Sequence, residues 1–184
     1  MLHNVIVRQN SLNQNTMDAK KSMLIFVVED NVLFNKMVCE HLKKNNYTNL
    51  KSFVSGNECI NAVMKGEHPD IVIQDYFLDD INGVDVLKAV KKQSRKSEFI
   101  FLTANEDIEV AIDSMKYGAL DYIIKEKGDV LNRLVDKLNK VTKLILIKRK
   151  DKATRIAMIL LVLILFLIIV SGILLYVFGF IENG

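Results

Sequence analysis

Cysteine and histidine are scarce in this chain of 184 residues, with two and three copies respectively. Cys39 and Cys59 fall in separate predicted helices, and no cysteine or histidine has a partner at a spacing typical of metal ligands. A disulfide framework and a zinc site are therefore disfavoured, and we expect two free thiols. The amino-terminal residues also lack an apolar core, which argues against a signal peptide.

Charge is missing from one long segment near the carboxyl terminus. Residues 156–181 are 26 consecutive uncharged residues. A helix of this length is about 39 Å long at ~1.5 Å per residue, which exceeds the roughly 30 Å of hydrocarbon in a bilayer, so it can span with tilt. The alternative is a buried core helix, which would need a large partner that the remaining residues do not supply. We therefore predict a transmembrane helix over residues 156–181.

An excess of basic residues is also confined to one place. Residues 148–155 contain five basic residues and one acid, whereas residues 1–147 contain 20 basic and 20 acidic residues. The net charge of +3 therefore comes from the basic residues just before the predicted span. Because the rest of the chain has no excess of basic residues, a role in binding nucleic acid has no support. The positive-inside bias places the amino-terminal part in the cytoplasm. We expect contact with membrane lipid through residues 148–181.

Residues 23–150 alternate between short apolar runs and helical patterns, without internal repeats. The predicted strands are 23–28, 49–54, 71–74, 99–102 and 120–124. The predicted helices are 32–45, 56–65, 83–93, 108–117 and a last one from residue 129 onward. Asn31, Ser55 and Asn82 suit the N-caps of three helices, because their side chains accept from first-turn amides. Alternating strands and helices predict right-handed crossovers and a parallel sheet in a doubly wound α/β domain.

Carboxylates follow two of the predicted strands. Asp75 comes directly after residues 71–74, and Glu29 and Asp30 come directly after residues 23–28. Open α/β sheets bind their ligands at the carboxyl ends of the strands. If the two strands are neighbours, three carboxylates converge there, as a divalent cation with oxygen ligands requires.

A hydroxyl and an ammonium group follow two later strands, at Thr103 and Lys125. Together with the three carboxylates they form a constellation suited to phosphoryl transfer. One carboxylate attacks phosphorus, while the metal, Thr103 and Lys125 stabilise charge on the phosphoryl oxygens. We interpret Asp79, Asp80 and Asp85 as solvated loop and first-turn acids with structural rather than catalytic roles.

Four blocks of the sequence resemble the receiver domain of two-component response regulators. They are Val28-Glu29-Asp30-Asn31, Asp75 with Asn82-Gly83, Leu102-Thr103-Ala104, and the run from Gly118 through Asp121-Tyr122-Ile123-Ile124-Lys125. All four occur in order within about residues 23–140. The resemblance implies a flavodoxin-like (βα)5 fold with the strand order 2-1-3-4-5.

The resemblance also implies a role for each site residue. Asp75 would accept a phosphoryl group from a histidine kinase or a phosphotransfer protein, and Thr103 and Lys125 would engage that group. Tyr122 would change its rotamer as Thr103 moves. Asp30 would bind Mg²⁺ directly and Glu29 would act at the metal site through water, with Asp75 and the backbone carbonyl of Phe77 as further ligands. The chain would then be a phospho-acceptor rather than an enzyme with turnover.

Two residues depart from the family pattern, because Asp79 and Glu126 stand where receivers usually have proline. A cis bond before Glu126 would cost ~3 kcal/mol, so we expect a trans bond and a slightly shifted Lys125. These departures leave open a receiver-like scaffold that is never phosphorylated. A phosphohydrolase with Asp75 as nucleophile is a second alternative, but Phe77 occupies the position at which such enzymes usually keep a second acid.

The last predicted helix is longer than a receiver needs. Residues 129–155 contain no glycine or proline, and apolar residues recur at spacings of three and four, as in a heptad seam: Leu131, Leu134, Leu138, Val141 and Ile145. Homodimerisation through this stalk or the span is therefore a hypothesis. We predict four segments, namely a disordered lead-in (1–22), a receiver (23–140), a basic helical stalk (141–155) and the span (156–181).

The complete prediction is a stand-alone receiver on the cytoplasmic face of the cell inner membrane. It is held there by a single-pass helix at its carboxyl-terminal end. Since we expect no effector domain after the receiver, its output would be protein–protein contact.

Overall fold

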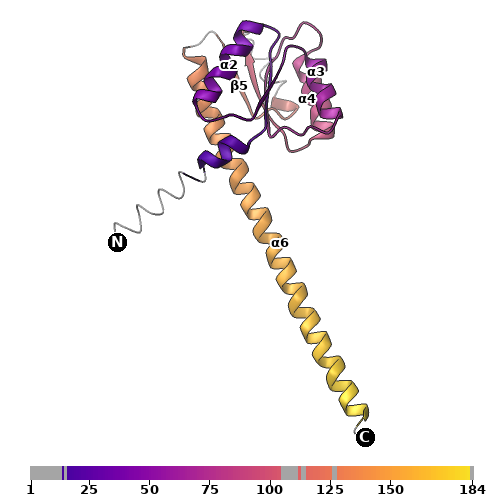
Figure 1. Cartoon of the computed structure of the whole chain (residues 1–184). Coiled ribbons are helices and arrows are strands. Elements are labelled where there is room, and N and C mark those ends of the chain that lie inside the picture. Colours follow the sequence, from indigo (N-terminus) through magenta and orange to yellow (C-terminus); the bar gives the residue numbers. More distant parts are fainter. Residues whose placement is uncertain (1–13, 15, 105–111, 113–114, 126–127, 183–184) are drawn as a thin grey trace, which may run out of the picture. The chain divides into compact units, whose positions relative to one another are not determined.

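The structure is a computed structural model that describes residues 14, 16–104, 112, 115–125 and 128–182. Contacts divide the chain into two compact units, Met1–Thr142 and Lys143–Gly184. The elements of both units are labelled or coloured in Figure 1. The first unit contains an α/β fold, and the second contains the greater part of the last helix.

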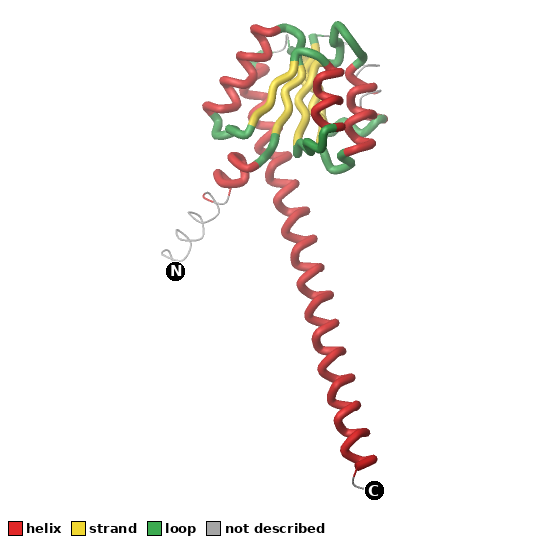
Figure 2. Tube along the Cα trace, turned by 45° about the vertical axis from the view of Figure 1, so that its right-hand side comes forward, coloured by secondary structure: helices red, strands yellow, loops and turns green. Residues whose placement is uncertain are grey.

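Among the described residues, the strands form one parallel sheet in the order β2-β1-β3-β4-β5, as predicted. Figure 2 shows these strands side by side. Their bounds are Ile25–Val28 (β1), Leu50–Phe53 (β2), Ile71–Asp75 (β3), Glu98–Thr103 (β4) and Asp121–Ile124 (β5). Every residue of β1 and β3 is buried, because a central parallel strand is covered on both faces. The continuous apolar runs in the sequence reflect this burial.

Helices cover both faces of the sheet (Figures 1 and 2). Helices α3 and α4 lie on one face, and α2 and the beginning of α6 lie on the other. The bounds are Val32–Lys44 (α2), Gly56–Met64 (α3), Gly83–Gln93 (α4) and Val130–Glu182 (α6). These helices begin within one residue of their predicted positions. Most of the helix predicted for residues 108–117 lies outside the described residues.

The three predicted N-caps are confirmed. Asn31 accepts a hydrogen bond from the amide of Phe34, and Ser55 accepts one from Glu58. Asn82 likewise accepts from the amide of Val84. Each cap satisfies an amide that has no partner within its helix, and each starts its helix soon after the end of a strand.

Residues 16–22 are helical, which differs from the disordered lead-in predicted for residues 1–22. Ala19 and Met23 are both buried, and the amide of Met23 donates to the carbonyl of Ala19 at 3.0 Å. The composition alone suggested no periodic structure, but burial of two apolar residues four positions apart stabilises a helical turn. Residues 1–13 and 15 of the predicted lead-in lie outside the described residues.

The beginning of α6 belongs to the first unit, and it packs there through part of the predicted apolar seam. Leu134 and Leu138 are fully buried, and Val141 is 4% exposed. The buried hydroxyl of Tyr47 also makes hydrogen bonds to Asn139 at 3.1 Å and Thr142 at 3.2 Å. Burial of these residues explains why apolar residues recur at spacings of three and four at the start of α6, well before the uncharged segment.

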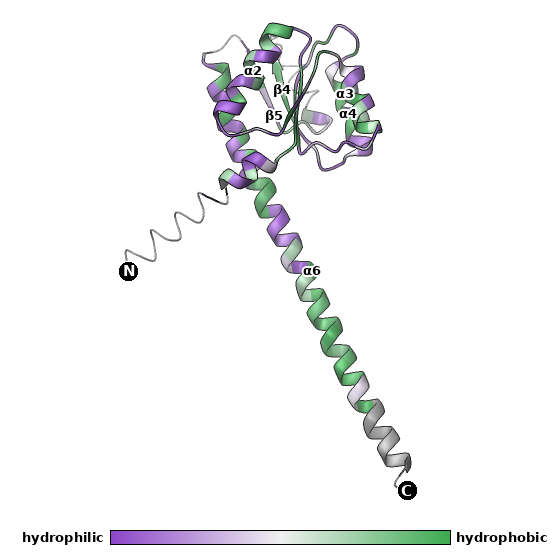
Figure 3. Cartoon of the chain, in the orientation of Figure 1, coloured by the Kyte–Doolittle hydropathy of each residue, from purple (hydrophilic) through white to green (hydrophobic). Residues whose placement is uncertain are grey.

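The second unit contains the long uncharged part of α6. By length and composition this helix is suited to cross a membrane. Its apolar side chains between Ile156 and Ile173 are largely exposed, and most of this part of the ribbon has the hydrophobic colour in Figure 3. An apolar surface on all sides of a helix is typical of a membrane span or a deeply buried helix.

Candidate functional site

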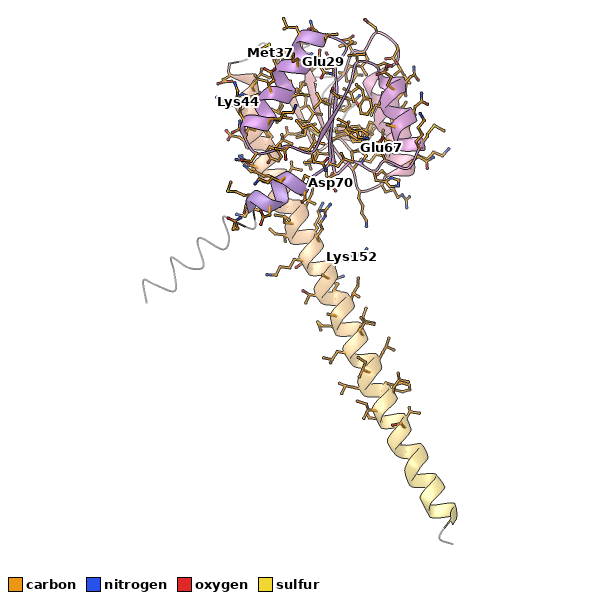
Figure 4. All side chains as sticks on the ribbon, in the orientation of Figure 1. Glu29, Met37, Lys44, Glu67, Asp70 and Lys152 are labelled. Carbon is orange, nitrogen blue, oxygen red and sulfur yellow. The ribbon has the colours of Figure 1, made fainter. Side chains whose placement is uncertain are left out.

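Three carboxylates meet at the carboxyl edge of the sheet. Strand β1 pairs with β3 in a register that places Val28 opposite Gln74, so Glu29 and Asp75 follow side by side. Oxygen atoms of Glu29, Asp30 and Asp75 lie within 4.8 Å of one another. Figure 4 shows Glu29 at this edge and Asp70, which precedes β3, at the opposite edge. The predicted convergence of the three acids is therefore present.

Two of these acids are nearly inaccessible to solvent. Glu29 is 3% exposed and Asp75 is 8% exposed, whereas Asp30 is half-buried. Burial raises the pKa of Glu29 to about 7, against the opposing effect of the Lys125 ammonium group and with a further increase from Asp75 and Asp30. The protein therefore holds the ionised form of Glu29 at a cost, and added positive charge at this site would offset that cost.

Lys125 lies between two of the carboxylates. Its Nζ is 2.6 Å from Glu29 Oε2 and 2.5 Å from Asp75 Oδ2. The amide of Lys125 donates to the carbonyl of Thr103 at 2.7 Å. The Nζ atom of Lys125 also lies 4.6 Å from the centroid of the Phe34 ring, which is within cation–π range. The ammonium group is thus positioned from several sides. The bond to Glu126, predicted to be trans, lies outside the described residues.

Thr103 comes from β4, the neighbour of β3, and Tyr122 comes from β5, the next strand along the sheet. Asp75 pairs with Leu102 on β4, so Thr103 follows at the same edge of the sheet, and it is fully buried. Tyr122 pairs with Phe101 and packs against the hydrophobic core. The edge therefore contains the predicted hydroxyl next to the carboxylates, while the predicted rotamer change of Tyr122 stays a prediction.

Phe77 lies in the loop that follows Asp75. Its amide donates to Asp75 Oδ1 at 3.2 Å, and its backbone pairs with Asn82 in an isolated bridge. The side chain of Phe77 is 52% exposed. The backbone of Phe77 is therefore tied to the carboxylate of Asp75.

Two acids of the same loop have specific contacts that the sequence did not reveal. The amide of Asp79 donates to Asp30 Oδ2 at 3.1 Å, a bond that proline at this position would lack. The carboxylate of Asp80 accepts hydrogen bonds from three residues at the start of α3: Ser55, Gly56 and Asn57. Asp80 is exposed, as predicted for a solvated acid, and these hydrogen bonds fit the structural role predicted for it. In the sequence, these hydrogen bonds were indicated only by the run Ser55-Gly56-Asn57, which provides donors at the start of a predicted helix.

The donor set fits a divalent cation with oxygen ligands. Three carboxylates lie close together, two of them buried, and hard cations such as Mg²⁺ prefer oxygen ligands. Burial, with a smaller effect of Asp75 and Asp30, raises the pKa of Glu29 and so disfavours its ionised form. A bound cation would offset that effect.

Comparisons with known proteins agree with this geometry. The model of the response regulator receiver domain family matches residues 25–139. The chemotaxis protein CheY of Thermotoga maritima is 29% identical over 119 residues, which cover 65% of this chain and 97% of that protein. The regulatory protein LuxO of Vibrio cholerae is 38% identical over 71 residues, 39% of this chain but only 15% of LuxO. The chain therefore spans a small part of the length of such regulators.

Solved structures show the same fold. The BeF3-activated receiver domain of DrrB, a protein of Thermotoga maritima, has a TM-score of 0.59 and 25% identity, covering 66% of this chain and 97% of that one. The amino-terminal domain of a three-domain response regulator from Carboxydothermus hydrogenoformans has a TM-score of 0.60 and 24% identity, covering 67% and 97%. With the strand order and the family match over residues 25–139, these findings lead to one conclusion: the chain belongs to the response regulator receiver domain family.

Proposed function

We propose that this protein accepts a phosphoryl group on Asp75, in a Mg²⁺-dependent transfer from the phosphohistidine of a histidine kinase or a phosphotransfer protein. The observation that carries the proposal is the arrangement of Asp75 with Glu29, Asp30 and Lys125 within one small, largely buried cluster. Membership of the receiver family supports the same chemistry.

In the proposed reaction a carboxylate oxygen of Asp75 attacks phosphorus. A P–O bond forms, the P–N bond to the donor histidine breaks, and the histidine leaves with the bonding electron pair. Lys125 is placed to stabilise negative charge on the phosphoryl oxygens because its Nζ already contacts Asp75. Thr103, at the end of the neighbouring strand, is proposed to donate its hydroxyl to the same group. When bound, Mg²⁺ would neutralise charge at the site.

The residues proposed to hold Mg²⁺ are Glu29, Asp30, Asp75 and, through its backbone carbonyl, Phe77. Burial of Glu29 makes its own charge costly, so a divalent cation gains affinity from relieving that cost. Tyr122 is proposed as the side chain that responds when Thr103 engages the phosphoryl group. In this role the protein is a phospho-acceptor, not an enzyme with turnover.

We further propose that residues 156–181 anchor the protein in the cell inner membrane, with the receiver (residues 23–140) in the cytoplasm. The support is the length and apolar composition of this part of α6 and the five basic residues among 148–155 just before it. Residues 141–155 would form a helical stalk whose basic side chains contact lipid headgroups. Output would then occur through contact with proteins at the membrane, including a second copy through the stalk or span, and not through nucleic acid.

Membrane anchoring is tested by fractionation. The full chain is expected in the membrane fraction after carbonate extraction at high pH, whereas a variant that ends at residue 147 is expected in the supernatant. Release of the full chain by carbonate would contradict the anchor. In protease protection of inverted membrane vesicles, the receiver should be digested; a protected receiver would contradict the orientation.

Phosphorylation is tested with the full chain in a mild detergent, using acetyl phosphate as donor and intact mass as readout. We expect a gain of one phosphoryl group that requires Mg²⁺ and is lost in Asp75→Asn. Asp85→Asn is the matched control, because Asp85 is an exposed carboxylate in the first turn of α4. No gain in a folded wild-type protein would refute phosphoryl transfer and favour a receiver-like scaffold that is never phosphorylated.

A further inference from the structure

The loop between β3 and α4, residues 76–82, is attached to residues that follow two other strands. The amide of Asp79 donates to Asp30 Oδ2 at 3.1 Å, and Asp30 follows β1. The carboxylate of Asp80 contacts the start of α3, the helix after β2. The ends of β1, β2 and β3 are therefore connected through two consecutive residues.

The contacts of Asp80 are numerous for an exposed side chain. Its Oδ2 accepts from Ser55 Oγ at 2.7 Å, from the Asn57 amide at 2.9 Å and from Asn57 Nδ2 at 2.8 Å. Its Oδ1 accepts from the Gly56 amide at 3.0 Å. Partial burial works to raise the pKa of Asp80, but the hydrogen bonds from Asn57, Ser55 and Gly56 outweigh it and lower the pKa to about 2. The carboxylate is therefore ionised at neutral pH.

The loop also packs closely on the start of α3. A Cβ atom at Gly56 would lie 2.4 Å from Cγ2 of Ile81 and 3.1 Å from Cδ1 of Leu78, both in the loop. It would also lie 2.6 Å from Cγ2 of Val86 in α4. The absence of a side chain at Gly56 thus permits the distance at which Asp80 reaches the amides of α3.

The cap of α3 does not depend on Asp80, because Ser55 already accepts from the amide of Glu58. What Asp80 adds is a connection between α3 and the loop that contains Phe77. The loop is held at Phe77 by Asp75, at Asp79 by Asp30, and at Asp80 by the start of α3. Loss of the last contact would leave the loop held by the bonds of the Phe77 and Asp79 amides to the cluster of acids.

We propose that Asp80 is a positioning residue: by binding the start of α3 it holds the β3–α4 loop so that Asp30 and the Phe77 carbonyl are preorganised to bind Mg²⁺. The inference rests on the proposed function. Supporting contacts of this kind set the orientation of ligands, and their removal typically weakens metal binding by about 10–100-fold.

The test compares Mg²⁺ affinity by isothermal titration calorimetry in the full chain in detergent, at a temperature below the unfolding transition of each variant. Asp80→Ala is expected to bind Mg²⁺ at least about tenfold more weakly than the wild type. Asp85→Ala, the matched control, removes an exposed acid whose ion pair, among the described residues, is with Lys88, and its affinity should equal that of the wild type. Gly56→Ala, which leaves all charges in place, should also weaken binding, because Ile81 and Leu78 must move.

If folded Asp80→Ala binds Mg²⁺ with wild-type affinity, the proposal is overturned, and Asp80 only contacts the start of α3. If Asp80→Ala does not fold, Asp80→Asn decides: it retains one acceptor for Gly56 but presents an NH₂ group to the other donors, and wild-type affinity in this variant would equally overturn the proposal. Failure of the proposed function gives a different result, because the wild-type protein itself would then bind no Mg²⁺.

Discussion

Replacing Glu29 with glutamine is expected to stabilise the Mg²⁺-free protein at neutral pH. Glu29 is 3% exposed, and burial raises the pKa of its carboxyl group to about 7 from an ordinary value of 4.5. A raised carboxyl pKa means that the folded state binds the proton more tightly than the unfolded state does. The ionised carboxylate therefore destabilises the fold above pH 7, and the effect disappears as the pH falls towards 4.5.

The magnitude follows from the two pKa values. Their difference corresponds to about 3 kcal/mol at 1.36 kcal/mol per pH unit, and solvent screening near the half-buried Asp30 reduces this to about 1–2 kcal/mol. Glutamine keeps the shape of the side chain and an oxygen that accepts from Lys125, but it has no charge to desolvate. For a unit of this size, the gain corresponds to a rise in Tm of about 2–8 °C.

The assay is thermal unfolding by circular dichroism of the full chain in detergent with EDTA, at pH 7.5 and pH 5. Glu29→Gln should exceed the wild type in Tm at pH 7.5, and the advantage should be much smaller at pH 5, where Glu29 is protonated in the folded wild type but still largely ionised in the unfolded chain. Glu40→Gln makes the same change at an exposed position of α2 and should alter neither value. A lower Tm for Glu29→Gln at pH 7.5, or an advantage independent of pH, would show that the ionised Glu29 carboxylate does not destabilise the fold.

Three further predictions concern single side chains. Gly83→Ala should lower the free energy of unfolding by about 1–3 kcal/mol, because the added Cβ would lie 2.8 Å from the backbone oxygen of Asp75; an unchanged Tm would contradict this. Tyr47→Phe should cost about 1–3 kcal/mol, since it leaves the buried hydroxyl of Thr142 without this partner, and chemical unfolding monitored by circular dichroism measures the loss. Lys125→Met should slow phosphorylation by acetyl phosphate on the order of a hundredfold, as followed by intact mass over time; a wild-type rate would exclude Lys125 from the reaction.

The sheet and the convergence of acids could be predicted from the sequence because both depend on local patterns. Continuous apolar runs identified β1 and β3, which are buried on both faces. The positions of the carboxylates at the ends of these runs could then be predicted, because the carboxyl ends of parallel strands lie at the same edge of the sheet. Asn31, Ser55 and Asn82 were predictable for a similar reason, since a cap bonds only to amides within its own first turn.

The contacts of Asp80 and Tyr47 were not predictable in this way. Asp80 contacts residues 23 to 25 positions away, and Tyr47 contacts residues 92 and 95 positions away. Such bonds depend on how loops and helices pack, and an aspartate in a polar loop has the same sequence signature whether it is solvated or bonded. The helical turn at residues 16–22 was missed because its stability comes from burial of Ala19 and Met23 rather than from local propensity.

Site mapping determines whether Asp75 itself receives the phosphoryl group. The full chain in detergent is incubated with acetyl phosphate and Mg²⁺, and then reduced with borohydride, which converts a phosphorylated aspartate into homoserine. We predict that peptide mass spectrometry locates homoserine at position 75, that EDTA prevents its formation, and that Asp85→Asn leaves it unchanged. Homoserine at another acid, or none in a protein shown to be folded and to bind Mg²⁺, would show that Asp75 is not the phospho-acceptor.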